Sequence, residues 1–292
     1  MNPRKTSYKE IFELIPGIEK ACLEMGVNIH SKSALGKCIE ATKKINNAWE
    51  SGDKTISNSP DFFDLLDGMH LCGIIGTSIK LFRDQTGFKD KIELLTKDEL
   101  NFNISIHSSS RNLLSEIIIA NTFKRINWQV NWEEPDLIVE HRVNNHTIRF
   151  AIACKMLESI NNLEKLLSKA KKQIHNNTSS AVGVLKGLVA VDLSQIFNNN
   201  VLRTLEFKDG PSITKILADD LQRFEKNHKR LFDKLKSSNE IIGLLLYSLN
   251  SCVIRQGSPL PHSVTQLNIH PFRSDNSVYT ATLKMLPNLI EQ

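Results

Sequence analysis

Hydrophobic residues in the first hundred positions recur mostly at helical spacing. Apolar side chains over 8–15 recur every three or four residues, which predicts a helix that ends at Pro16-Gly17. Similar spacing predicts a helix over 33–49, and the apolar stretch 61–82 is expected to be a buried helix or helix pair. Three glycines are expected to break that stretch: Gly68, Gly73 and Gly76. The pattern predicts a mainly helical N-terminal domain, residues 1–103, that docks a substrate or partner.

From about residue 104 the pattern alternates between helical and extended periods. A helix is expected over 110–125, followed by an extended piece at 128–132 and by strands over 136–141 and 147–155. The later elements are expected to be a helix over 162–175, a strand over 187–191, a long charged helix over 219–237, a buried strand over 241–249, a loop marked by Pro259, Pro261 and Pro271, and a last strand over 278–285. Residues 104–292 are therefore predicted to form an α/β domain.

Strict alternation over 147–155 assigns each side chain of that strand to one of two faces. One face is expected to carry Ile148, Phe150, Ile152 and Cys154, and the other Thr147, Arg149, Ala151, Ala153 and Lys155. Cys154 is therefore predicted to be a core thiol and not a nucleophile.

Charged residues with a possible chemical role follow one another in this part of the chain. Glu116 lies on the apolar stripe of the helix over 110–125, Asp136 opens a strand, and Lys155 ends the next strand. Glu116 either reaches water at the edge of its stripe or faces a metal ion or a lysine, because a buried carboxylate needs a partner. Carboxylates can hold Mg²⁺ with positions left open for water and phosphate, and a neighbouring lysine can act on that water.

The helix over 162–175 is strongly basic. It carries Lys165, Lys169, Lys171 and Lys172, with Gln173 near its end. These cations form either an ordinary solvated face or a track for phosphate groups.

The sequence of these features resembles the PD-(D/E)xK nuclease superfamily over roughly residues 108–195. Pro135-Asp136 and Lys155 match its motif, Glu116 matches its helix acid, and the basic helix matches the helix that follows. The resemblance implies a restriction-endonuclease-like mixed central sheet flanked by helices, and a Mg²⁺- or Mn²⁺-dependent nuclease for which DNA is favoured over RNA as the expected substrate. It also implies metal ligands at Asp136, Glu116 and position 153, with Lys155 acting on the water. The implied nucleic-acid contacts are Lys169, Lys171, Lys172 and Gln173.

Nucleases of this build that stand alone often resemble components of bacterial defence or restriction systems. By that analogy a partner protein subunit or a homodimer is expected.

Position 153 departs from the motif, because alanine stands where the pattern has Asp or Glu. Three explanations remain open: an engineered inactivating substitution, an acid that has moved to Glu116, Glu140 or Glu158, or a natural pseudo-nuclease. In the last case the chain is a non-catalytic subunit that binds nucleic acid or serves as a scaffold.

Composition adds little to this picture. A formal charge of +5 over 292 residues is compatible with a polyanionic ligand. The five cysteines form no CxxC pair, and the first twenty residues lack an apolar segment. We therefore expect reduced thiols, a cytoplasmic location and no membrane segment.

Overall fold

The computed structural model describes residues 7–97, 109–143, 146–180, 185–197, 206–207, 210–256, 258–272 and 277–290. The helices are α1 (Tyr8–Phe12), α2 (Ile15–Glu24), α3 (Ala34–Glu50), η1 (Lys54–Asn58), α4 (Phe62–Phe82), α5 (Phe88–Lys97), α6 (Ser109–Arg125), η2 (Ile160–Asn162), α7 (Leu163–Ser180), α8 (Ser194–Phe197), α10 (Gly210–Asn227), α11 (Lys229–Lys236) and α12 (Val278–Ile290). The strands are β1 (Gln129–Asn131), β2 (Leu137–Val143), β3 (His146–Met156), β4 (Lys186–Asp192), β5 (Glu206–Phe207), β6 (Ile241–Gln256) and β7 (Ser258–Pro271).

The strands form one mixed sheet. Its order is β1-β2-β3-β4-β6, and β6 also pairs with β5 in parallel and with β7 antiparallel. The pairs β1–β2 and β2–β3 are antiparallel, whereas β3, β4 and β6 run parallel. The prediction of an α/β fold with a mixed sheet, flanking helices and a helical N-terminal region is therefore confirmed. The predicted boundary at residues 103 and 104 lies outside the described residues.

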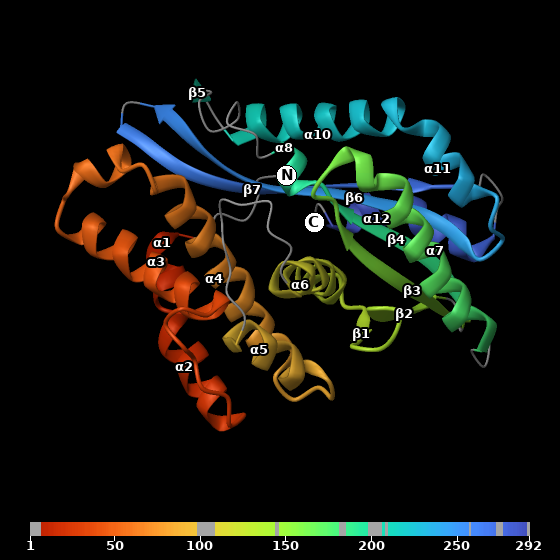
Figure 1. The fold of residues 1–292 in the computed structure, drawn as a ribbon, viewed down its shortest axis with the longest axis horizontal. Coiled ribbons are helices and arrows are strands. Elements are labelled where there is room, and N and C mark those ends of the chain that lie inside the picture. The colour runs from red at the N-terminus through yellow and green to blue at the C-terminus, as the bar shows by residue number, and fades with distance from the viewer. Residues whose placement is uncertain are drawn as a thin grey trace.

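Helices cover both faces of this sheet (Figure 1). On one face the core joins α6, α12 and the N-terminal helices to inward side chains such as Phe150 and Leu188. On the other face α7, α10 and α11 pack on side chains such as Val189 and Leu244. The predicted alternation along β3 is confirmed, because Ile152 and Cys154 belong to the first core and Ala153 to the second.

Two predictions about the N-terminal helices are wrong. Pro16 lies in the first turn of α2 and does not end a helix. Proline is tolerated there because the first turn leaves its N–H groups unbonded in any case. The glycines of α4 do not break it, and the helix is continuous from Phe62 to Phe82. Gly76 permits close packing, since a Cβ there would lie 3.1 Å from side-chain atoms of Leu14 and Ile18.

Helix α4 is the one described helix that is long and apolar enough to cross a membrane. In this fold 61% of its most apolar window is buried, and its side chains pack among α3 and α6. The helix is therefore packed as a core helix of this fold.

Two predictions about the C-terminal part are also wrong. Residues 258–271 form strand β7 at an edge of the sheet, although prolines were expected to make this segment a loop. The position numbers of Pro259, Pro261 and Pro271 differ by even amounts, so their backbone nitrogens face the same side of β7. An edge strand needs no N–H donor on its unpaired side, which explains why prolines are tolerated there. Residues 278–290 form helix α12 and not a strand, and Ser277 Oγ accepts a hydrogen bond from the N–H of Thr280 at 3.3 Å.

The long charged helix expected over 219–237 is present as two helices, α10 and α11, which meet at His228. The side chains that this helix pair buries against the sheet include Leu221, Phe224, Phe232 and Leu235.

Candidate active site and lysine-lined pocket

Asp136 and Lys155 are in direct contact. Leu137 pairs with Ile152, so the residue just before β2 lies beside the end of β3. Lys155 Nζ donates to Asp136 Oδ2 at 3.0 Å and to its neighbour's carbonyl oxygen, Cys154 O, at 2.8 Å. The backbone N–H of Cys154 donates to the same Asp136 oxygen at 2.7 Å. The β2–β3 register therefore fixes this carboxylate at the strand end.

Glu116 faces a lysine, which is one of the two alternatives that the sequence left open. Lys91 Nζ, from α5, donates to Glu116 Oε2 at 2.7 Å, and the Glu116 side chain is 12% exposed. The pairing agrees with the rule that a carboxylate on an apolar stripe requires a compensating charge.

The charges of Glu116 and Asp136 influence each other. Burial raises the pKa of Glu116 and Lys91 opposes that rise, while the charge of Asp136 raises this pKa further and the charge of Lys155 lowers it. Burial likewise raises the pKa of Asp136, and Lys155 opposes it most strongly. The structure thus pairs Asp136 with Lys155 and Glu116 with Lys91, and the two ion pairs influence each other's charges.

Position 153 is part of the core beneath α7. Ala153 is fully buried, among side chains that include Leu167, Ala170 and Val189. Of the acids that could replace a ligand there, Glu140 is held by Arg149 at 2.6 Å across the β2–β3 pair. Glu158 lines the pocket described below, and Glu116 influences the charge of Asp136, so these two acids remain as alternatives.

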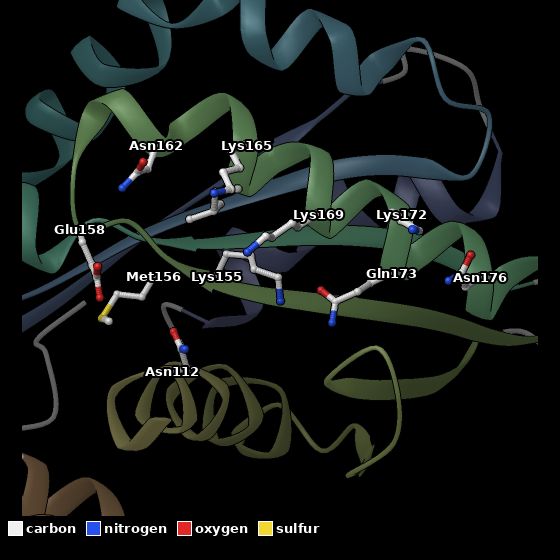
Figure 2. Close-up of a pocket in the computed structure, with 11 residues that line it drawn as sticks. Asn112, Lys155, Met156, Glu158, Asn162, Lys165, Lys169, Lys172, Gln173 and Asn176 are labelled. Atoms are coloured by element: carbon white, nitrogen blue, oxygen red, sulfur yellow. The ribbon is translucent and has the colours of Figure 1, made fainter. Parts of the chain in front are cut away.

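A pocket of about 620 Å³ lies between the end of β3, helix α7 and the start of α6 (Figure 2). Its charged lining consists of Lys155, Lys165, Lys169, Lys172 and a single acid, Glu158. Four amide side chains complete its polar wall: Asn112, Asn162, Gln173 and Asn176. An excess of cations in a concave site favours an anionic ligand.

Helical spacing explains which residues of α7 reach this pocket. Lys165, Lys169, Lys172 and Asn176 recur at three- and four-residue intervals and share one face of the helix. Lys171 is exposed and is not among the residues that line the pocket, whereas Lys165 does line it. Gln173 Nε2 donates to Pro135 O at 3.5 Å, and its buried Oε1 has no hydrogen-bond partner among the described residues.

Two polar residues near the site were not found from the sequence. Lys91 could not be found, because its position depends on how α5 packs on α6. Asp192, buried at the end of β4, is the second, and an acid directly after an apolar strand was the available signal. Asp192 Oδ1 accepts from the backbone N–H of Ser194 at 2.8 Å, and Arg111 favours its charged form, although burial raises the pKa of Asp192 overall.

The donor atoms in this region suit an open Mg²⁺ or Mn²⁺ site. Proteins hold Mg²⁺ through one or two carboxylates, and substrate phosphates and waters complete the shell. Glu116, Asp136 and the carbonyl oxygen of Cys154 are donors of this kind. Within the described ranges no group of three or more His, Cys, Asp or Glu side chains gathers into a closed metal site.

Comparison with family models, with curated proteins and with solved structures finds no match to this chain.

Proposed function

We propose that this chain is a metal-dependent nuclease that hydrolyses phosphodiester bonds in DNA. One observation carries the proposal: Lys155 lines the four-lysine pocket and donates to Asp136 at 3.0 Å. Because the Lys155 ammonium contacts both the pocket and Asp136, it can hold a phosphate in the pocket beside that carboxylate. The resemblance to the PD-(D/E)xK superfamily and its restriction-endonuclease-like core points to the same chemistry.

Binding would rest on the face of α7 that lines the pocket. Lys165, Lys169 and Lys172 would contact successive phosphates, which releases counterions and makes the affinity depend on salt. Asn112 and Gln173 add hydrogen-bonding groups that are suited to sugar or base atoms. RNA offers the same phosphates, so DNA is preferred on the resemblance alone.

Catalysis would use the carboxylate pair and Lys155. Bound Mg²⁺ or Mn²⁺ would lower the pKa of a water molecule and offset charge on the phosphate. Asp136 and Glu116 would hold the ion. Lys155 would orient the attacking water and stabilise the negative charge that develops on the phosphate. Ala153 would contribute packing, with Glu116 supplying the second acid.

The second candidate is a nucleic-acid-binding subunit without catalytic activity. It is favoured by the salt bridges at the site, because Glu116 and Asp136 each already hold a lysine at 2.7 Å and 3.0 Å. In that case the pocket binds DNA and the carboxylates only position Lys155 and Lys91. A role in bacterial defence beside a partner subunit, or as a homodimer, suits both candidates. A cytoplasmic location agrees with the free thiols of Cys22, Cys38, Cys72 and Cys154.

Two assays on the full chain separate these candidates. Plasmid cleavage with Mg²⁺ or Mn²⁺ is expected for the native sequence and is expected to fall by roughly 100-fold or more in Asp136→Asn and in Lys155→Met. DNA binding in EDTA, measured by fluorescence anisotropy, is expected to survive Asp136→Asn. Binding without cleavage, under every metal condition, supports the second candidate.

The pocket itself is tested by salt dependence. The triple variant of Lys165, Lys169 and Lys172 to Met is expected to reduce the slope of log affinity against log salt by about 2–3, since each phosphate contact contributes about 0.7–0.9. Lys171→Met is the control, because it removes one charge from α7 outside the pocket, and it is compared with the triple variant per charge removed. An equal change in slope per removed charge in the two variants would show that the net charge of the helix, and not the pocket, binds DNA.

A further inference from the structure

The N-terminal helices contribute a charged side chain to the candidate site. In α5 the residues Phe88, Ile92 and Leu95 are fully buried and attach the helix to the core. Lys91 lies beside this buried face and reaches Glu116 of α6 at 2.7 Å. Because the side chains of Lys91 and Glu116 are only 29% and 12% exposed, water screens this ion pair less than it screens a surface pair.

We propose that Lys91 is a built-in counterion of the Glu116–Asp136 carboxylate pair, which a divalent cation must displace before the pair can hold it. The inference rests on the proposed metal-dependent function and adds to it a residue that controls metal affinity. It assigns Lys91 as a positioning residue, since the ammonium acts through Glu116 and touches no substrate.

The two lysines of the site differ in what they can do when a cation arrives. Lys155 Nζ has a second acceptor, Cys154 O at 2.8 Å, and lines the pocket, so it can stay beside a bound phosphate. Lys91 belongs to another helix and does not line the pocket, and its side chain is 29% exposed. A lysine side chain of this kind can turn its ammonium into water while its stem stays packed.

Charge balance gives a reason for such a counterion. The charge of Asp136 adds to the effect of burial on Glu116, and buried carboxylates that repel each other resist ionisation. With Lys91 and Lys155 in place, two cations balance two anions and the site is stable without metal. A divalent ion brings two positive charges, so the departure of one or both ammonium groups from the carboxylates keeps the site close to neutral.

A simple structural salt bridge is the competing explanation, and it predicts a different response to Lys91→Met. If the pair only stabilises the packing of α5 on α6, the variant loses stability and its metal affinity stays equal or falls. If Lys91 competes with the metal, the variant binds metal more tightly. Removal of a unit charge within about 5 Å of a divalent ion predicts a gain of about tenfold or more.

The experiment is a calorimetric titration of the full chain with MnCl₂ at pH 8. Lys91→Met is expected to bind Mn²⁺ about tenfold more tightly than the native sequence, and Lys91→Arg, which keeps the charge, is expected to match the native affinity. Lys97→Met is the matched control, because Lys97 lies on the same helix and pairs with Glu93 at 2.5 Å on the surface. Thermal melting in EDTA establishes that each variant folds, and Lys91→Gln replaces Lys91→Met if the latter melts early.

The outcomes separate this inference from the proposed function. Equal Mn²⁺ affinity in the native chain and in Lys91→Met, or a lower affinity in Lys91→Met, would overturn the counterion role. The nuclease proposal would still stand. Absence of Mn²⁺ binding in every variant would overturn both. A tenfold gain in Lys97→Met as well would show that the effect comes from the net charge of α5 and would also overturn the role of Lys91.

Discussion

Substitution of Ala153 by glutamate is expected to destabilise the fold strongly. Ala153 is fully buried between the sheet and α7, among Leu163 and Leu167. Burial of one charge costs several kcal/mol, and a larger side chain in a packed core adds about 1–3 kcal/mol. Lys155 follows on the same strand face and offsets part of this, so we expect a net loss of about 4 kcal/mol. For a chain of this size that corresponds to a fall in Tm of about 8–16 °C.

Thermal melting followed by circular dichroism measures this change, and Ala151→Glu provides the matched control. Ala151 is also fully buried and lies two residues earlier on the same face of β3, next to Ile138 and Leu185. If position 153 is a core position, the two variants melt at similar temperatures. The reasoning is refuted if Ala153→Glu melts within about 2 °C of the native chain while Ala151→Glu is strongly destabilised. Position 153 would then accept a carboxylate beside Lys155, as expected of a missing metal ligand.

Three further changes test other contacts. Tyr247→Phe removes the hydroxyl that donates to Ser115 Oγ at 2.5 Å; we expect urea unfolding to show a loss of about 1–3 kcal/mol, and a loss below about 0.5 kcal/mol would contradict the contact. Burial raises the pKa of Glu116 above 4.5, so the folded state holds that proton more tightly and the free energy of unfolding falls as pH rises through the raised pKa. Glu116→Gln is expected to flatten that part of the profile in EDTA, and an unchanged profile would contradict the assignment. A Cβ at Gly187 would overlap Ile174 Cγ2 of α7, so Gly187→Ala is expected to lower stability by about 1–3 kcal/mol and to weaken DNA binding; an unchanged Tm would show that α7 adjusts freely.

Local periodicity was sufficient to predict the centre of the sheet. The strict alternation over 147–155 correctly separated Cys154 from Ala153 and Lys155, because a two-residue period is a property of the strand itself. The contact between Asp136 and Lys155 follows from an acid that opens one strand and a lysine that ends its antiparallel neighbour. These features involve residues that are close together in the sequence, so the sequence pattern alone predicts them.

The remaining features depend on long-range packing. The position of Lys91 over Glu116 requires α5 to dock on α6, and no spacing within either helix specifies that approach. The full burial of Ala153 depends on where α7 crosses the sheet. The prolines of β7 led to a wrong prediction of a loop, because proline occurs in edge strands as well as in loops. Only the pairing with β6 distinguishes the two.

Helices α4 and α6 are joined by a buried amide. Asn121 Nδ2 donates to Ser78 Oγ at 2.8 Å and to Ile74 O at 3.3 Å, and one continuous core surrounds these groups. A fragment cut near residue 104 would leave this amide without its acceptors and would expose the apolar face of α6 to solvent. Attempts to express the C-terminal part by itself should therefore give aggregated material, and a useful shorter version would need to retain α4 and α5.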